Sequence, residues 1–250
     1  MIKLYRTPLV TLLSSPQFFE PKHLPVQWLG EATDGERLAE YAGRACYMSQ
    51  ANSAKRTTAE YLENIKQLAH FSVLEHANYS FLFEGVSRSL SHELVRHRHQ
   101  SPSQLSQRYV DESDVGFVVP VAILGDVELE AEYAETCARA LDRYTELVDT
   151  LLDKYASIAS TTERRKKARE AAREVLPNGT ETKLVVTGNA RTWRHFLRLR
   201  GSLGADAQIA RLAVEVFKQL NAVAPGFFGD FSIQYDHNQR AHLVTPYAGE

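Results

Sequence analysis

The sequence has 250 residues, 44% of them apolar, and a formal net charge of -2. A chain of this size can bury a sizeable core, and we expect one domain over residues 1–250. The near-neutral charge argues against a general nucleic-acid coat protein, because such proteins carry a broad basic excess. Arg6 and Pro8 interrupt the apolar residues at the start, and no later apolar run is long enough to span a bilayer, so a cytoplasmic location is expected.

Two capping boxes mark the first helices. Thr33 with Glu36, and Thr57 with Glu60, have the Thr-x-x-Glu spacing in which side chain and backbone satisfy each other at a helix N-terminus. Apolar residues follow both boxes at helical spacing. The sequence therefore predicts two helices, of which the second ends near His70.

Extended or irregular segments surround these helices. Residues 2–13 are rich in apolar side chains and could hold a strand, whereas the polar residues 50–56 read as a linker. Tyr79, Phe81 and Phe83 then alternate with polar residues. This period of two is typical of a strand with one buried face.

The segment 96–109 is the most unusual part of the chain. Between Leu94 and Val110 there is no Asp or Glu, while three arginines, two histidines, three serines and three glutamines gather there. A helix is predicted over 87–99, and Pro102 disfavours helical backbone before it, so these polar residues should lie on a loop. Arginine suits phosphate, and Ser and Gln suit base edges, which predicts an anion site for a nucleotide-like ligand. A solvated loop or a surface basic patch is the alternative.

The second half of the chain is mainly helical. The helix predicted over 127–157 is long enough to form a subunit interface, or it could complete the domain's own core. The helix over 160–177 is strongly basic, and most of its charge should be a solvated face. The other predicted elements are a short edge strand at 117–121, a strand at 183–189, a helix at 191–200 and a final amphipathic helix at 209–220 that Pro225 stops.

The two cysteines form no CxxC pair and no disulfide framework. Cys46 and Cys137 both fall on apolar helix faces, so both are expected to be core residues and not nucleophiles. His70, Glu75 and His76 lack the spacing of a known metal motif. A turn with a Glu–His hydrogen bond is the preferred interpretation of these three residues.

Several separated elements of the chain resemble the flavin-dependent thymidylate synthases. The run Arg96-His97-Arg98, seven residues and Ser106 is similar to the RHR-x7-S signature of that family. The segment around Ser72 matches its His-x-Ser/Thr-x-x-Glu-His element. The family's Ala-Arg-x-x-Leu-Pro element and its Asn-x-Arg helix are matched by Arg173, Asn189, Arg191, His195 and Arg200. The resemblance spans about residues 41–224.

This resemblance implies a fold and an activity. The expected fold class is α+β, with a mixed or antiparallel sheet flanked by long helices. The implied enzyme is a methyltransferase that converts dUMP to dTMP, with 5,10-methylenetetrahydrofolate as carbon donor and NADPH, through FAD, as hydride source, and it gives tetrahydrofolate. No G-x-G-x-x-G follows a strand, so side chains must hold the flavin. The family implies a homotetramer with shared active sites.

The resemblance also assigns roles to residues. Arg200 is the expected catalytic residue, because a fixed cation near uracil can stabilise negative charge on the ring without attack by sulfur. Flavin contacts are implied for Ser72, Arg96, His97, Arg98, Gln104, Asn189, Ala190, Arg191 and His195. Substrate contacts are implied for Glu93, Arg96, Gln104, Leu105, Ser106, Gln107, Arg108, Arg173 and Arg200. No metal ligand is expected.

The chain departs from the family at several positions. Where relatives usually have His and Glu after the catalytic arginine, this chain has Gly204 and Gln208, which removes local support for Arg200. Gln100 and Pro102 stand where many relatives carry aromatic or apolar residues.

Three other interpretations remain open. The 96–109 segment could belong to a nucleotide- or nucleic-acid-binding module without catalysis. His92, His97 and His99 could form a metal hydrolase, although no acidic ligand set accompanies them. Ser106 could be a covalent nucleophile, although no His-Asp pair activates it.

Overall fold

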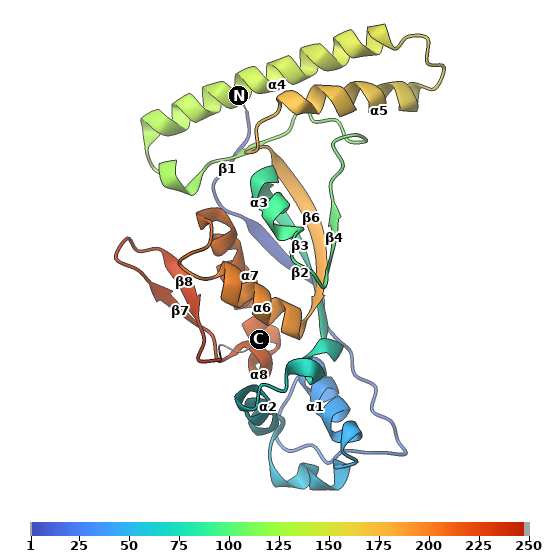
Figure 1. Ribbon diagram of the computed structural model, residues 1–250, viewed down its shortest axis with the longest axis vertical. Coiled ribbons are helices and arrows are strands. Elements are labelled where there is room, and N and C mark those ends of the chain that lie inside the picture. The colour runs from blue at the N-terminus through green and yellow to red at the C-terminus, as the bar shows by residue number, and fades with distance from the viewer. Residues whose placement is uncertain (1, 248–250) are drawn as a thin grey trace. The chain divides into compact units, whose positions relative to one another are not determined.

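The computed structural model describes residues 2–247 and contains both helices and strands (Figure 1). The helices are α1 (Asp34–Cys46), α2 (Thr58–Gln67), α3 (Arg88–Leu94), α4 (Val127–Lys154), α5 (Thr161–Ala172), α6 (Ala190–Arg200), α7 (Ala207–Val223) and α8 (Pro225–Phe228). Short 3-10 helices are η1 (Gln50–Lys55), η2 (Phe71–His76), η3 (Val121–Ile123) and η4 (Arg173–Val175).

The strands form three sheets. They are β1 (Leu4–Tyr5), β2 (Leu9–Ser14), β3 (Asn78–Ser87), β4 (Gln100–Gln104), β5 (Phe117–Val118), β6 (Glu181–Asn189), β7 (Ser232–Tyr235) and β8 (Ala241–Val244). One sheet has four strands in the order β2-β3-β6-β4. In the two-stranded sheets, β1 is parallel to β5 and β7 is antiparallel to β8. The expected α+β fold class is confirmed.

The chain forms two compact units, and the long strands β3 and β6 contribute residues to both. The first unit comprises 1–9, 83–96 and 103–184, and the second comprises 10–82, 97–102 and 185–250. The expectation of a single domain stays a prediction.

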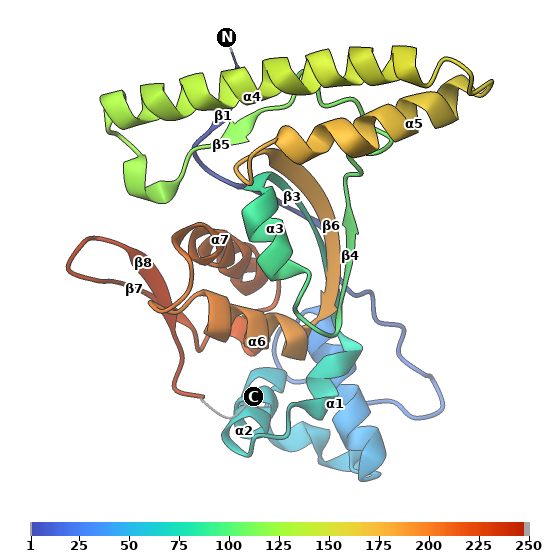
Figure 2. The same cartoon turned by 45° about the horizontal axis from the view of Figure 1, so that its top comes forward.

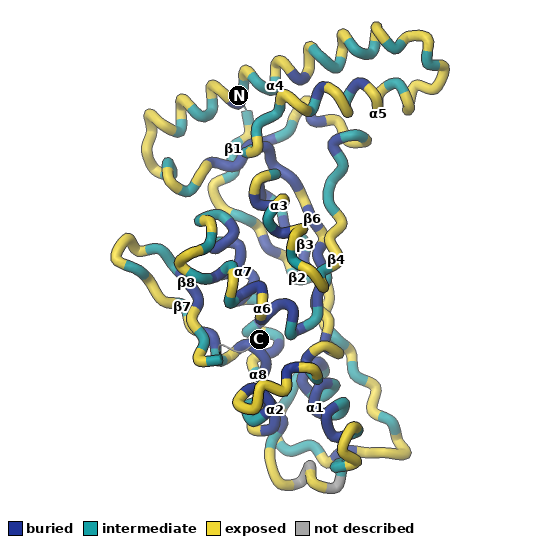
Figure 3. Tube along the Cα trace, in the orientation of Figure 1, coloured by how far each residue is buried: buried dark blue, intermediate teal, exposed yellow. Residues whose placement is uncertain are grey.

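The first unit contains the longest helix. α4 packs along α5, and the two helices lie side by side in both views (Figures 1 and 2). Of the 28 residues of α4, only Cys137 and Tyr144 are buried, and most of the helix is exposed or intermediate in Figure 3. The helix therefore contributes two side chains to the core of its own chain, while Val127 is 82% exposed.

The second unit contains most of the aromatic core. Tyr79 and Phe81 are buried on alternate positions of β3, as predicted from the period of two. The ring of Phe81 meets that of Trp193 edge to face at 5.1 Å, and the indole N–H of Trp193 donates to the Tyr79 carbonyl at 3.1 Å. Aromatic packing thus fixes α6 against this end of the sheet.

The helix starts at α1 and α2 agree with the prediction. Thr33 and Thr57 are the N-cap residues, and Glu36 and Glu60 accept from the cap backbone. At the second helix the Thr57 hydroxyl also accepts from the Glu60 N–H at 3.2 Å, whereas the Thr33 hydroxyl has no such hydrogen bond. Both helices therefore begin where the sequence places them. None of the helices within residues 2–247 combines the length and apolar character needed to cross a membrane.

The segment after α3 differs from the prediction. α3 ends at Leu94 and not near His99, and residues 100–104 form strand β4 and not a loop. His99 has a φ of +66°, a left-handed conformation that stops regular structure before the strand begins. β4 lies at the end of the strand order, where the missing N–H of Pro102 breaks no interior ladder.

Three other elements were not predicted. Residues 50–55 form the 3-10 helix η1 instead of an irregular linker, and 232–244 form the β7–β8 hairpin. Cys46 was predicted to be a core residue, but it is exposed. It is the last residue of α1. Cys137 is buried, as predicted.

Candidate active site

A polar cavity in the first unit collects positive charge. It has a volume of about 330 Å³, and Arg88, Gln107 and Arg173 are among its lining residues. Arg88 is the first residue of α3, after the N-cap Ser87, and Arg173 begins η4 directly after α5. Two helix ends therefore bring two arginines to one cavity.

The charges around this cavity oppose one another. Burial lowers the pKa of Arg88, and repulsion from Arg173 lowers it further, while the Glu112 carboxylate raises it. Two guanidinium groups this close favour an anion between them, since an anion relieves their repulsion. The cavity can therefore bind a phosphate group.

The predicted substrate residues of this unit have different surroundings. Gln107 is 8% exposed and lies in the cavity wall with Arg173. Arg108 instead pairs with Glu170 at 2.7 Å on the surface. The structure thus brings Gln107 and Arg173 together in one cavity wall, where Arg173 also pairs with Glu174 at 3.6 Å, and it holds Arg108 in a separate ion pair.

The other predicted residues of the 93–106 region make structural contacts or face solvent. Gln104 Nε2 donates to the Ser91 hydroxyl at 2.9 Å. Leu105 N–H donates to the Lys183 carbonyl at 2.9 Å. The Ser106 carbonyl accepts from two backbone N–H groups that follow it. Arg96 is exposed, and Glu93 is partly buried.

A second cluster lies in the other unit, around the predicted catalytic arginine. Arg200 Nε donates to His97 Nε2 at 2.8 Å. The rings of His97 and His195 meet edge to face with centroids 6.2 Å apart. Arg200 and His195 both belong to α6, so one helix carries both groups and one histidine of the 96–109 segment joins them.

His97 must be neutral to accept this hydrogen bond. Burial, followed by the nearby positive charge of Arg200, lowers the pKa of His97 to about 4. Burial also lowers the pKa of His195. His97 therefore holds the Arg200 side chain in place, a role for which the sequence offered no candidate after the changes at Gly204 and Gln208.

Two predicted flavin residues share a further cavity in the second unit. This cavity measures about 380 Å³, and Ser72, Arg191, His70 and Cys46 are among its lining residues. Arg191 Nη1 donates to Glu75 Oε1 at 2.6 Å. The expected Glu–His hydrogen bond at Glu75 is therefore replaced by an ion pair with an arginine of α6.

Asn189 and Ala190 set the start of α6. The Asn189 side chain caps the helix by accepting from Thr192 N–H at 2.8 Å. Ala190 is fully buried, and its N–H donates to the Ala77 carbonyl at 2.8 Å. These contacts fix the helix and hence the direction of Arg191, His195 and Arg200. Arg98 is exposed.

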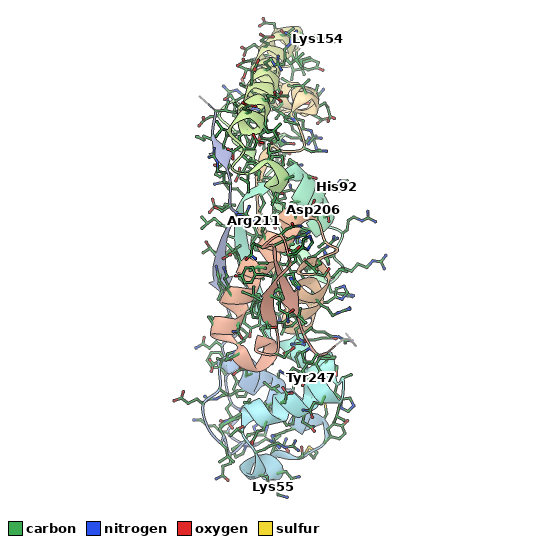
Figure 4. All side chains as sticks on the ribbon, turned by 90° about the vertical axis from the view of Figure 1, so that its left-hand side faces the viewer. Lys55, His92, Lys154, Asp206, Arg211 and Tyr247 are labelled. Carbon is green, nitrogen blue, oxygen red and sulfur yellow. The ribbon has the colours of Figure 1, made fainter. Side chains whose placement is uncertain are left out.

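The histidines do not form a metal site. Within residues 2–247 there is no group of three or more His, Cys, Asp or Glu side chains that could hold a metal ion. His97 uses Nε2 to accept from Arg200, and His92, labelled in Figure 4, is exposed on α3.

The second unit has a donor set that fits a flavin dinucleotide. Such a cofactor presents two phosphates and a ring edge with carbonyl and N–H groups. Arg98, His195 and Arg191 offer positive or donor groups, and Ser72 offers a hydroxyl within the cavity. Both amide atoms of Gln100 are buried without a hydrogen-bond partner, so a polar ligand group could satisfy them.

Comparison with known proteins identifies the family. Residues 29–226 match the family model described as thymidylate synthase complementing protein. The chain belongs to the flavin-dependent thymidylate synthase family. Two relatives named flavin-dependent thymidylate synthase, from Mycobacterium tuberculosis and Mycolicibacterium gilvum, are 49% and 50% identical over 226 residues, which is 90% of this chain and 90% of each relative.

A solved structure has the same fold as this family member. The crystal structure of a UMP/dUMP methylase, PolB from Streptomyces cacaoi bound with 5-Br dUMP, matches with a TM-score of 0.67. The match covers 91% of this chain and 96% of that chain at 23% sequence identity. At this identity the likeness supports the fold alone.

Sequence reasoning missed two residues of the first-unit cavity region, Arg88 and Glu112. A signal existed for Arg88, because a cation in the first turn of a helix opposes the helix dipole and is an unfavourable choice for stability alone. Glu112 gave no such signal. Acidic residues on predicted loops are common, and its 2% exposure follows from packing distant in sequence.

Proposed function

We propose that this member of the family methylates dUMP reductively to dTMP. The carbon comes from 5,10-methylenetetrahydrofolate, the hydride comes from NADPH through FAD, and the folate product is tetrahydrofolate. The observation that carries the proposal is the Arg200–His97 pair, in which a neutral histidine of the 96–109 segment holds a cation of α6.

Arg200 is the catalytic residue in this proposal. Uracil C5 becomes nucleophilic when negative charge spreads over the ring, and a guanidinium group at the ring edge stabilises that charge. The accepted hydrogen bond at His97 fixes the side chain before substrate arrives, so less reorganisation is needed during reaction. Cys137 is an unsuitable nucleophile, because it is buried and burial raises its thiol pKa.

The first-unit cavity is the proposed phosphate site. Arg173 and Gln107 already lie in its wall. Arg108 joins them by exchanging Glu170 for phosphate, which is feasible because that pair is solvent-exposed and weak. Ser106 and Leu105 complete the nucleotide contacts, and Glu93 with Arg96 bridges nucleotide and flavin.

The flavin site is proposed to combine Ser72 and Arg191 from the 380 Å³ cavity with His195 and Asn189–Ala190 of α6. Arg96, His97, Arg98 and Gln104 contact the FAD phosphates and ring edge. When bound, FAD supplies hydride transfer. The protein orients it and places positive charge beside its phosphates.

We also propose a homotetramer in which subunits share active sites. The exposed apolar residues of α4, such as Val127 and Leu129, give this long helix a surface suited to a subunit interface. We propose further that the enzyme is cytoplasmic and that residues 1–250 form a single domain.

The proposal is tested by NADPH oxidation with purified protein and FAD, with and without dUMP. Stimulation by dUMP and formation of dTMP are expected. Arg200→Ala should retain the yellow flavin but lose dTMP formation by a factor of hundreds or more, about 3 kcal/mol for a lost charge-stabilising group. Arg165→Ala, at an exposed position of α5, is the matched control.

Two results would contradict the proposal. Colourless protein that cannot take up FAD would favour a nucleotide-binding module without catalysis. Undiminished dTMP synthesis by Arg200→Ala would remove Arg200 from the catalytic role.

A further inference from the structure

A buried carboxyl group lies beside the phosphate cavity. Glu112 is 2% exposed, and its Oε2 atom has no hydrogen-bond partner among the described residues. Two residues that line the cavity stabilise its ionised form, Arg88 through its positive charge and Gln107 through a side-chain hydrogen bond. Glu112 thus interacts with two of the cavity residues and is not itself among the residues that line the cavity.

Charged and polar groups from several elements surround Glu112. Arg88 of α3 is the cation that most strongly influences its carboxyl, whereas Glu181 of β6 and the neighbouring Asp111 add negative charge. Tyr144 of α4 accepts a hydrogen bond from the Glu112 backbone N–H at 3.3 Å. Arg169 of α5 forms an ion pair with Asp111 at 2.8 Å.

These contacts make Arg88 the countercharge of Glu112 in the ligand-free protein. A phosphate in the cavity adds negative charge next to the same guanidinium. Two anions would then compete for Arg88, and one of them is buried where water cannot compensate. Protonation of the carboxyl removes this conflict and leaves Arg88 to the phosphate.

We propose that Glu112 is a positioning residue of the phosphate cavity that takes up one proton from solvent when an anion binds, and so couples nucleotide affinity to pH. The inference rests on the proposed function for the phosphate site and for the identity of the nucleotide. No covalent bond changes, since a proton moves from buffer to a Glu112 carboxylate oxygen. The protonated carboxyl can still accept from Gln107, which keeps that side chain in the wall.

The electrostatics of the free protein agree with this coupling. Burial raises the pKa of Glu112 to about 7, against the opposing effects of Arg88 and Gln107. A carboxyl group in this range is partly ionised at neutral pH, so a nearby anion can complete its protonation. The phosphate itself has a second pKa of about 6 and can only release protons on binding as a dianion, so the two contributions have opposite sign.

The test is isothermal titration calorimetry of the whole protein with dUMP at pH 7, in two buffers of different ionisation enthalpy. The wild type should take up about half a proton per dUMP bound, as expected for a group at its pKa. Deoxyuridine, which lacks the phosphate, should give no uptake. Glu112→Gln should bind dUMP with uptake abolished. Equal uptake by the variant and the wild type, or no uptake by the wild type, would overturn the inference.

A second measurement needs no variant. The wild-type Kd for dUMP should weaken above pH 7, by up to about tenfold per pH unit, while that for deoxyuridine stays flat. Circular dichroism establishes whether Glu112→Gln is folded. If the variant is unfolded, the pH dependence of the wild-type Kd for dUMP tests the coupling by itself. A flat dUMP profile would refute the coupling.

Sulfate separates this inference from the proposed function, because it is a dianion without a titrating proton near pH 7. Sulfate binding with proton uptake, in a protein that makes no dTMP, would sink the synthase proposal and keep the role of Glu112. dTMP synthesis without proton uptake on binding of either dUMP or sulfate would keep the synthase proposal and overturn the role of Glu112.

Discussion

The burial of His97 beside the positive charge of Arg200 makes a measurable contribution to the pH dependence of stability. His97 has an ordinary pKa of 6.5 and a folded-state pKa of about 4. Below pH 6.5 the unfolded chain binds a proton that the folded protein refuses, so stability is lost as pH falls from 6.5 towards 4. At pH 5 this linkage amounts to about 2 kcal/mol, and solvent screening of the partly exposed ring reduces it to about 1 kcal/mol.

Urea unfolding at pH 7 and pH 5, at one protein concentration, measures this effect. The variant His97→Gln keeps a hydrogen-bond acceptor but cannot titrate. Its loss of stability between the two pH values should be smaller than that of the wild type by about 1 kcal/mol. Because all other titrating groups are the same in both proteins, their contributions cancel in this difference. His195→Gln provides the comparison for the second histidine, whose lowered pKa acts in the same direction. An identical pH-dependent loss in His97→Gln and wild type would refute the reasoning.

Two further predictions concern binding and stability. Arg173→Ala should raise the KM for dUMP by about 10- to 100-fold, since a hydrogen bond to a charged group is worth about 1.5–3 kcal/mol, whereas Arg165→Ala at an exposed position of α5 should not change it. Equal KM values for both variants would exclude Arg173 from the phosphate site. Asp230→Asn should lower the free energy of unfolding in urea by about 3–5 kcal/mol, because it removes the negative charge that two buried cations share, Arg194 at 2.6 Å and Lys66 at 3.1 Å. A loss below about 1 kcal/mol would show that their other hydrogen-bond partners compensate for the lost charge.

Local sequence signals predicted the parts of the fold that local physics controls. The boxes at Thr33 and Thr57 fix helix starts through contacts within four residues, so no knowledge of the remaining chain was needed. The alternation of Tyr79 and Phe81 likewise follows from strand geometry and one buried face. The motif spacing around Arg96 identified the family, and family membership is confirmed by the match over residues 29–226.

The remaining features depend on contacts between distant parts of the chain. α3 stops at Leu94 because the following residues pair into the sheet beside β6, and this pairing overrides helical spacing. Periodicity placed Cys46 on the apolar face of its helix, yet this last residue of α1 is exposed. The raised pKa of Glu112 and the pairing of His97 with Arg200 join residues that are far apart in sequence, so neither had a local signature.

The polar strand β4 has a consequence for self-association. It ends the four-stranded order, and its sequence Gln-Ser-Pro-Ser-Gln offers no apolar side chain except the ring of Pro102, where one N–H donor is also missing. An incoming strand from another molecule would gain neither a continuous ladder nor much buried apolar area there. Edge-to-edge pairing of two copies of this chain through β4 is therefore disfavoured.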